Sequence, residues 1–131
     1  MGYRSEVMAA FYTTNKDEAP LLKLFIEENW PKEGNLTAYE WLNSEQYFGI
    51  IFHEEDVKWY ESFSEVQAFD AFAEKFMEIA REESIDGKEQ RRPDWFYEFV
   101  RIGEEYQDIE IKGTYFSDNI LSVSRAVLVN V

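Results

Sequence analysis

Cysteine is absent from this 131-residue sequence, and histidine occurs only once, as His53. Without cysteine the chain can form no disulfide, no thiolate nucleophile and no thiolate metal site, a composition that fits a reducing compartment. The single histidine excludes a zinc site built from several histidines. Most of the side chains that commonly hold a metal tightly are therefore missing.

Glycine-rich loops and long apolar runs are missing as well. The six glycines are scattered, so no glycine-rich phosphate loop occurs, and the nucleophile-elbow motif is absent. No run approaches the roughly 20 apolar residues that span a bilayer, and residues 1–15 lack the pattern of a signal peptide. We expect a cytoplasmic protein that is not an enzyme, with no cofactor and with no catalytic, cofactor-binding or metal-binding residues.

Basic residues are scarce: 13 Lys and Arg stand against 27 Asp and Glu, which gives a formal net charge of −14. This charge repels nucleic acid and anionic membrane, and no basic patch compensates for it. We expect no direct contact with either, and a protein partner with a basic surface instead. Keeping an aromatic-rich domain soluble is the simpler explanation of the same charge.

Apolar residues make up 45% of the sequence and aromatic residues 18%, which is enough for a packed core. The chain length fits a single domain over residues 1–131. Local patterns predict strands over residues 3–13, 47–53, 57–60, 95–102, 109–115 and 121–129. Capping residues and apolar periodicity predict helices from Asp17 to Trp30, over 38–43 and from Ser64 onward.

In this order of elements, one helix follows the first strand and another follows a hairpin with its turn at 54–56. The split βαβ arrangement that results predicts an α+β, ferredoxin-like fold. We expect an antiparallel sheet with two helices on one face and an extra C-terminal strand.

The helix that begins at Ser64 carries an acidic ridge opposite its apolar stripe, formed by Asp70, Glu74, Glu78 and Glu82 at intervals of four residues. Lys75 and Arg81 do not fully neutralise it. Trp59 and Tyr60 are consecutive in the second hairpin arm, so one layer of helices cannot bury both. We therefore predict that a partner binds Asp70, Glu74, Glu78, Glu82, Trp59 and Tyr60, although core packing is a close alternative for the aromatic pair.

Polar residues in or beside the predicted strands suggest a different kind of site. Arg4 and Arg101 either pair with the abundant acids or form an anion pocket on the sheet. His53 is either an ordinary polar residue at a strand end or a pH-sensitive group. A small ligand pocket would use Arg4, His53, Tyr60 and Arg101 as its polar groups.

Three segments together resemble small uncharacterised proteins of tailed bacteriophages and prophages: Gly2 to Val7, Asp56 to Ser62 running into Val66 to Phe69, and Tyr97 to Glu105. The resemblance covers most of the chain and transfers no catalytic residue. It implies an accessory protein that occupies a host or defence protein, because phage proteins of this size and acidity often act in that way.

The leading hypothesis is thus a small acidic, phage-derived protein that binds a host, defence or phage protein stoichiometrically. An inhibitor or a DNA mimic would be a narrower form of it. One alternative is a small-ligand binder or enzyme with a pocket on a ferredoxin-like sheet. Another is a structural homo-oligomer.

Overall fold

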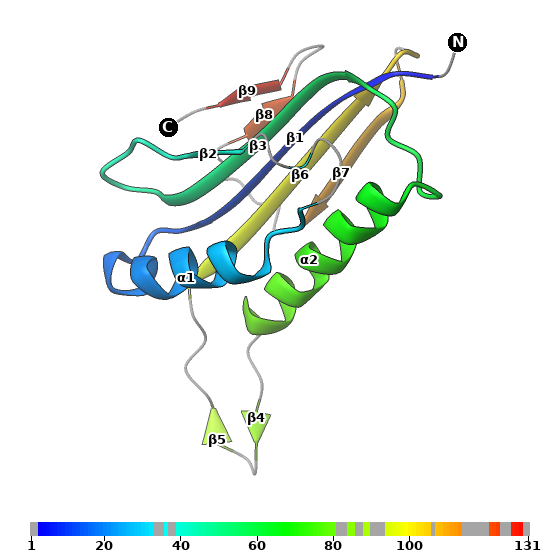
Figure 1. Ribbon diagram of the computed structural model, residues 1–131. Coiled ribbons are helices and arrows are strands. Elements are labelled where there is room, and N and C mark those ends of the chain that lie inside the picture. Colours follow the sequence, from blue (N-terminus) through cyan, green and yellow to red (C-terminus); the bar gives the residue numbers. More distant parts are fainter. Residues whose placement is uncertain are drawn as a thin grey trace.

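A five-stranded antiparallel sheet with two helices forms the body of the protein (Figure 1). The computed structural model describes residues 3–32, 36, 39–80, 84–85, 88–89, 94–105, 107–113, 121–123 and 127–129. In sheet order the strands are β2 (Tyr39–Trp41), β3 (Phe48–Val57), β1 (Ser5–Thr13), β6 (Trp95–Gly103) and β7 (Ile109–Gly113). The prediction of an α+β domain with an antiparallel sheet and two helices is confirmed.

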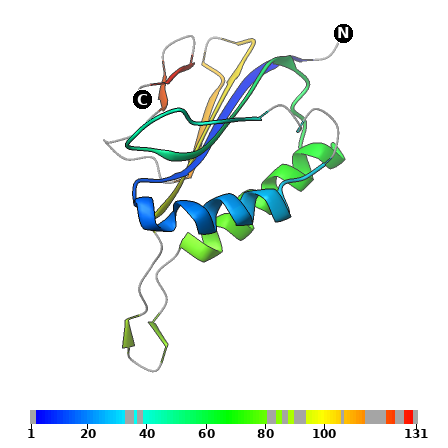
Figure 2. The same ribbon diagram turned by 60° about the vertical axis from the view of Figure 1, so that its left-hand side comes forward.

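Helices α1 (Ala19–Asn29) and α2 (Ser64–Ala80) lie on the same face of the sheet (Figures 1 and 2). A short 3-10 turn, Lys16–Glu18, leads into α1, and Pro20 sits in the first turn, where a missing N–H costs nothing. The helix stops at Trp30, which is extended and precedes Pro31. Both helices were predicted because their apolar residues recur with helical spacing. One residue of this apolar stripe in α2, Ile79, is 38% exposed.

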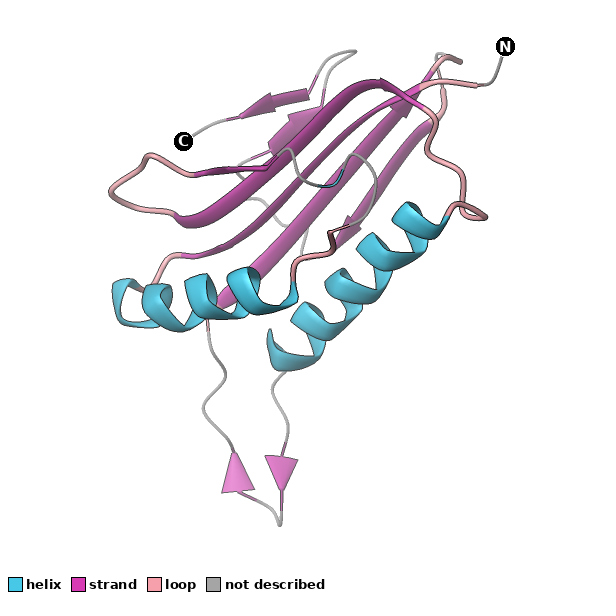
Figure 3. Cartoon of the chain, viewed as in Figure 1, coloured by secondary structure: helices cyan, strands magenta, loops and turns pink. Residues whose placement is uncertain are grey.

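The predicted helix over 38–43 is wrong, since this region contributes strand β2 to the sheet edge (Figure 3). Tyr39 pairs with Phe52 of β3, and its ring packs 5.1 Å from the ring of Trp30. Aromatic residues suit a strand that pairs on one side, and this tertiary contact outweighs the local capping signal. Thr37, whose spacing from Glu40 gave the capping signal, lies outside the described residues.

The predicted turn at 54–56 and the second arm over 57–60 are also wrong. β3 continues through these acidic residues to Val57, and the hairpin is the one that joins β2 to β3. Ser5 pairs with Val57 while Val7 pairs with Glu54, so the ladder contains a bulge, and Asp56 there has φ 55°. A bulge absorbs the irregular residue without reversing the chain.

The predicted terminal strand over 121–129 is instead two short strands, β8 (Leu121–Val123) and β9 (Val127–Val129), that pair with each other. Alternation of apolar and small residues cannot distinguish one strand from two arms of a hairpin. β8 contacts β6 on the face of the sheet away from the helices (Figures 1 and 2).

A further ladder, β4 (Ser84–Ile85) with β5 (Lys88–Glu89), follows α2. None of the helices in the described part of the chain has the length and apolarity to cross a membrane.

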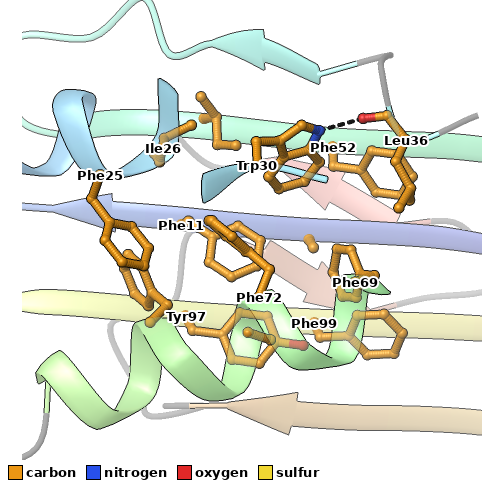
Figure 4. Close-up of a cluster of buried hydrophobic side chains, with 14 of the residues drawn as sticks. Phe11, Phe25, Ile26, Trp30, Leu36, Phe52, Phe69, Phe72, Tyr97 and Phe99 are labelled. Atoms are coloured by element: carbon orange, nitrogen blue, oxygen red, sulfur yellow. Dashed lines mark hydrogen bonds between the residues drawn. The ribbon is translucent and has the colours of Figure 1, made fainter. Parts of the chain in front are cut away.

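Phe11 of β1 is the centre of the core between sheet and helices (Figure 4). Its side chain is fully buried, and its ring stacks on Tyr97 of β6 at 4.7 Å. Four more rings lie within 6.0 Å, those of Trp30, Phe69, Phe72 and Phe76. The opposite face of β1 is buried too, in a second cluster that includes Met8, Ala10 and Tyr12. The hydroxyl of Tyr12 donates a hydrogen bond there to the fully buried carboxylate of Glu98.

We expect Phe11→Ala to lower the free energy of unfolding by about 3–5 kcal/mol, because the substitution leaves a cavity among five aromatic rings. Urea denaturation followed by circular dichroism measures this loss. Leu24→Ala is the control, since Leu24 is 51% exposed on α1 and its replacement should change stability by less than about 0.5 kcal/mol. Equal losses in the two variants would contradict the central position of Phe11.

Candidate functional site

A pocket of about 590 Å³ opens beside the first turns of α2, where the loop that links β3 to α2 faces β6 and β7. Its aromatic lining residues are Tyr3, Trp59 and Tyr60. Its charged lining residues are Glu61, Asp70, Arg101, Asp108, Glu110 and Lys112. We call it the aromatic–acidic pocket.

The aromatic wall of this pocket is fixed by the core. The ring of Trp59 meets Phe69 edge-on at 5.3 Å. Tyr60 packs against Phe63 at 5.1 Å, and its hydroxyl accepts a hydrogen bond of 2.6 Å from the backbone N–H of Tyr3. Because Trp59 and Tyr60 lie in a loop and not in a strand, both turn toward the pocket and both are partly buried.

Arg101 forms the polar floor of the pocket and is held by several partners. Its guanidinium donates to the two carboxylate oxygens of Asp108 at 2.8 and 3.1 Å, a bidentate pair. Further donations reach Glu110 at 3.3 Å and the hydroxyl of Ser5 at 3.2 Å. The two roles predicted for Arg101 were pairing with acids and binding an anion. The first describes this geometry, because carboxylates accept the hydrogen bonds of its guanidinium.

Asp108 receives a second strong hydrogen bond, from the hydroxyl of Tyr3 at 2.6 Å. The bonds from Arg101 and Tyr3 stabilise the ionised form and lower the pKa of the Asp108 carboxyl to about 2. The same bond raises the pKa of Tyr3, because its hydroxyl must keep its proton to donate. Arg101 likewise has a raised pKa through its bonds to Asp108.

Lys112 and Asp70 face each other across the pocket. The Lys112 ammonium lies 3.9 Å from Asp70 Oδ1, 3.9 Å from Glu110 Oε2 and 5.2 Å from the centroid of the Phe99 ring. Partial burial raises the pKa of Asp70, Lys112 opposes this rise, and the carboxylates of Glu110 and Glu61 add to it. The pocket is therefore a place where negative charge is in excess.

The acidic ridge continues from this pocket along α2. Asp70 lines the pocket, whereas Glu74 and Glu78 are exposed and form no ion pair within the described ranges. Lys75 does not neutralise them, because its ammonium donates to Asn29 Oδ1 of α1 at 2.7 Å. Glu82 and Arg81 fall outside the described residues.

Arg4 and His53 do not join Tyr60 and Arg101 in one pocket. Arg4 donates to the backbone oxygen of Asp56 at 3.0 Å and lines a separate hollow of about 270 Å³. His53 pairs in register with Met8 on the sheet face away from the helices, and its Nε2 lies 2.8 Å from Glu6 Oε2. The four residues predicted to share a ligand site thus lie in three different places.

Glu6, His53 and Glu55 offer donor atoms within 4.8 Å of one another, which is close enough to surround one metal ion. The hydrogen bond between His53 and Glu6 accounts for this arrangement without an ion. Glu55 is largely exposed and contributes only a distant contact of 3.8 Å to His53.

Sequence reasoning missed several residues of the aromatic–acidic pocket, namely Tyr3, Glu61, Asp108, Glu110 and Lys112. Glu110 and Lys112 alternate with Ile109 and Ile111, and this period of two could have placed them on one face of β7. Nothing local links Tyr3 to Asp108, which are brought together only by the pairing of β1 with β6.

Comparison with known proteins finds no family model, no curated protein and no solved structure that matches this chain. What the protein does must therefore be inferred from its own residues.

The pairing of Arg101 with Asp108 predicts a specific loss of stability in acid. The pKa of Asp108 is below its ordinary value in the folded protein, so the ionised carboxylate stabilises the fold above that ordinary pKa. This contribution is lost as the pH falls toward about 2. We expect Asp108→Asn to be destabilising at pH 7 and the gap in unfolding free energy from wild type to close between roughly pH 4 and pH 2.

Urea denaturation of both proteins across this pH range measures the gap. Glu74→Gln is the control, because this exposed carboxylate has no ion pair in the described structure, and its small effect should not depend on pH in the same way. A gap for Asp108→Asn that is the same at pH 7 and pH 2.5 would show that the pair does not stabilise the fold.

Proposed function

We propose that this protein acts by stoichiometric binding to another protein, through the acidic ridge of α2 and the adjacent aromatic residues Trp59 and Tyr60. One observation carries the proposal: Glu74 and Glu78 are exposed and unpaired within the described residues, while Lys75 is turned away to α1. A partner with a basic surface would supply the missing positive charge.

The net charge of −14 supports this proposal through association kinetics. A large field of one sign raises the encounter rate with a surface of the opposite sign, and the rate falls as salt screens the field. Aromatic side chains close to the charged surface then supply contact area that slows dissociation. Trp59 and Tyr60 lie beside Asp70, where the ridge begins.

The partner we propose is a host, defence or phage protein, met in the cytoplasm of the host cell and inhibited by occupation of a basic site. The phage-like segments of the sequence support a phage origin. The proposal contains no catalytic step, no cofactor and no direct contact with nucleic acid or membrane.

DNA mimicry is a narrower form of this proposal. Asp70, Glu74 and Glu78 span nine residues, or about 12 Å of helix axis. One strand of DNA places about four phosphates over that length. The described ridge has three carboxylates and covers well under half a turn of a duplex, so a shared binding site for DNA is an outcome to test and not the core of the proposal.

The fold we propose is ferredoxin-like, with β7 added to the sheet beside β6. The neighbour order β2-β3-β1-β6 and its antiparallel pairings support this assignment, since α1 and α2 each connect strands that have one other strand between them. A split βαβ fold is expected to have this arrangement.

Small-ligand binding is the second candidate function, and the aromatic–acidic pocket favours it. Its volume of about 590 Å³ is within the range of small-molecule sites. Its polar groups would be Tyr60 and Arg101, without the Arg4 and His53 of the original set. A structural homo-oligomer is a third candidate, which measurement of the molar mass in solution tests directly.

The proposed interaction can be tested by neutralising the ridge. Affinity capture from a bacterial lysate should recover a dominant partner, which is then purified and titrated by calorimetry. We expect one-to-one binding that is about tenfold weaker for the double variant Glu74→Gln/Glu78→Gln and slower to form as salt is raised. A double variant, Glu40→Gln/Glu45→Gln, at exposed residues of β2 and the loop after it, at the sheet edge opposite β7, changes the net charge equally and should bind as wild type does.

Equal weakening by both double variants would mean that overall charge matters and that the ridge is not the binding surface. Recovery of no partner, together with a small molecule retained by the purified protein, would favour the second candidate function.

A further inference from the structure

The two cations of the aromatic–acidic pocket are held in very different ways. Arg101 makes four hydrogen bonds of 3.3 Å or less, and its side chain is only 17% exposed. The Lys112 ammonium is 3.9 Å from each of its two carboxylates, too far for a direct hydrogen bond, and its side chain is 40% exposed. Arg101 is therefore a fixed part of the pocket, whereas Lys112 can leave at little cost.

The position of Lys112 shows where the pocket stabilises a cation. Its ammonium lies over the face of the Phe99 ring, where the ring quadrupole attracts positive charge. Asp70 on α2 and Glu110 on β7 face it from different elements. A second cation that reached this position would meet the same three groups.

Lys112 does not neutralise all of the negative charge of the pocket. The lining contains four carboxylates and two cations, and the guanidinium of Arg101 is already paired with Asp108. Burial raises the pKa of Asp70, and Glu61, one of these four carboxylates, is close enough to raise it further together with Glu110. A pocket with surplus carboxylates and aromatic walls favours a cationic guest over a neutral or anionic one.

Arginine suits these walls better than lysine does. Its guanidinium is flat, stacks on aromatic faces and donates in two directions, so it can lie against Trp59 while it bonds to Asp70 and Glu110. The ring of Trp59 is held in place by Phe69 and needs no rearrangement to form such a wall. A compact ammonium can satisfy the carboxylates but gains less from the ring.

We propose that the aromatic–acidic pocket receives an arginine side chain from the basic surface of a protein partner, and that Lys112 occupies this position until the arginine displaces it. This inference rests on the proposed function and identifies one contact within it. The occupant is a protein side chain because the pocket adjoins the acidic ridge, which attracts a basic surface to the same end of α2.

A capped pentapeptide, Gly-Ser-Arg-Ser-Gly, is a suitable probe, and the same peptide with citrulline replacing arginine is its neutral isostere. Titration is followed by NMR through the indole N–H of Trp59, assigned with Trp59→Phe. We expect saturable shifts of this signal with the arginine peptide and none with the citrulline peptide. The lysine peptide should bind more weakly than the arginine peptide.

The side chain of Lys112 reports displacement directly. Its ammonium lies over the Phe99 ring, so we expect the ring current to shield the neighbouring CH₂ protons in the free protein. They should move to the chemical shift of a solvated lysine as the arginine peptide saturates. Attraction of the peptide to the acidic surface at a distance would leave these protons unchanged and would overturn the inference.

Two matched pairs of variants locate the effect. Asp70→Asn should weaken the arginine peptide about fivefold, whereas Asp17→Asn, the same change at an exposed residue before α1 and outside the pocket lining, should not. Lys112→Gln should strengthen binding about threefold by removing the competing cation, whereas Lys75→Gln, which makes the same charge change beside α1, should have no effect. Unperturbed spectra away from the substitution confirm that each variant is folded.

Failure of this inference can be told apart from failure of the proposed function. If Glu74→Gln/Glu78→Gln weakens partner binding as expected while the arginine peptide does not shift the Trp59 signal, the ridge binds the partner and the pocket proposal is wrong. If the peptide displaces Lys112 but Asp70→Asn leaves partner binding unchanged, the pocket accepts arginine from some other source, which also overturns the proposal. Weaker binding of both the peptide and the partner by Asp70→Asn is the result expected.

Discussion

Burial of β1 on both faces is the constraint on which the rest of the structure depends. On one face Phe11 stacks on Tyr97 and is enclosed by Trp30, which ends α1, and by rings from α2, so both helices must lie across the sheet at this point. On the other face Met8, Ala10 and Tyr12 are equally buried. A strand enclosed in this way has to be central, and its neighbours β3 and β6 then fix the order of the sheet. The apolar stripe of α2 faces the sheet in this packing, so the acidic residues of the helix face outward.

The aromatic–acidic pocket forms where this apolar face ends. Across the sheet, Ala9 of β1 pairs with Phe99 of β6, and Phe99 pairs with Lys112 of β7. The side chains that face the helices in this row are therefore apolar on β1 and β6 and charged on β7. One row further, Val7 pairs with Arg101 and Arg101 with Glu110. α2 begins beside these residues, so the sheet there is covered by the loop that carries Trp59 and Tyr60. Hydrogen-bonded charged side chains take the place of hydrophobic packing at this end of the sheet.

The sequence was sufficient to predict the features that depend on a regular period. The two helices and the acidic ridge follow from spacings of three or four residues, and all but Glu82 can be located in the structure. β1 and β6 were predicted instead from their β-branched and aromatic composition. β2 and the bulged end of β3 were mispredicted because pairing with another strand overrode a local capping signal and a run of acidic residues. The pocket was only partly predicted, through Trp59, Tyr60, Asp70 and Arg101. Glu61 follows the predicted aromatic pair in the same loop, whereas Tyr3 precedes β1, Asp108 precedes β7, and Glu110 and Lys112 lie on β7. Only the sheet register brings these four residues together.

The acidic ridge and the aromatic–acidic pocket are suited to different stages of one encounter. Like charges four residues apart on a helix are destabilising by a few tenths of a kcal/mol per pair, so Glu74 and Glu78 do not help α2 to fold. Their field extends over roughly a Debye length, about 8 Å at physiological salt, and acts on a partner before contact. The groups around Phe99 and Trp59 are partly shielded from solvent, so a cation held there is screened less by salt and leaves more slowly. A surface of this kind would attract a basic partner through α2 and retain it through the pocket at the end of the same helix.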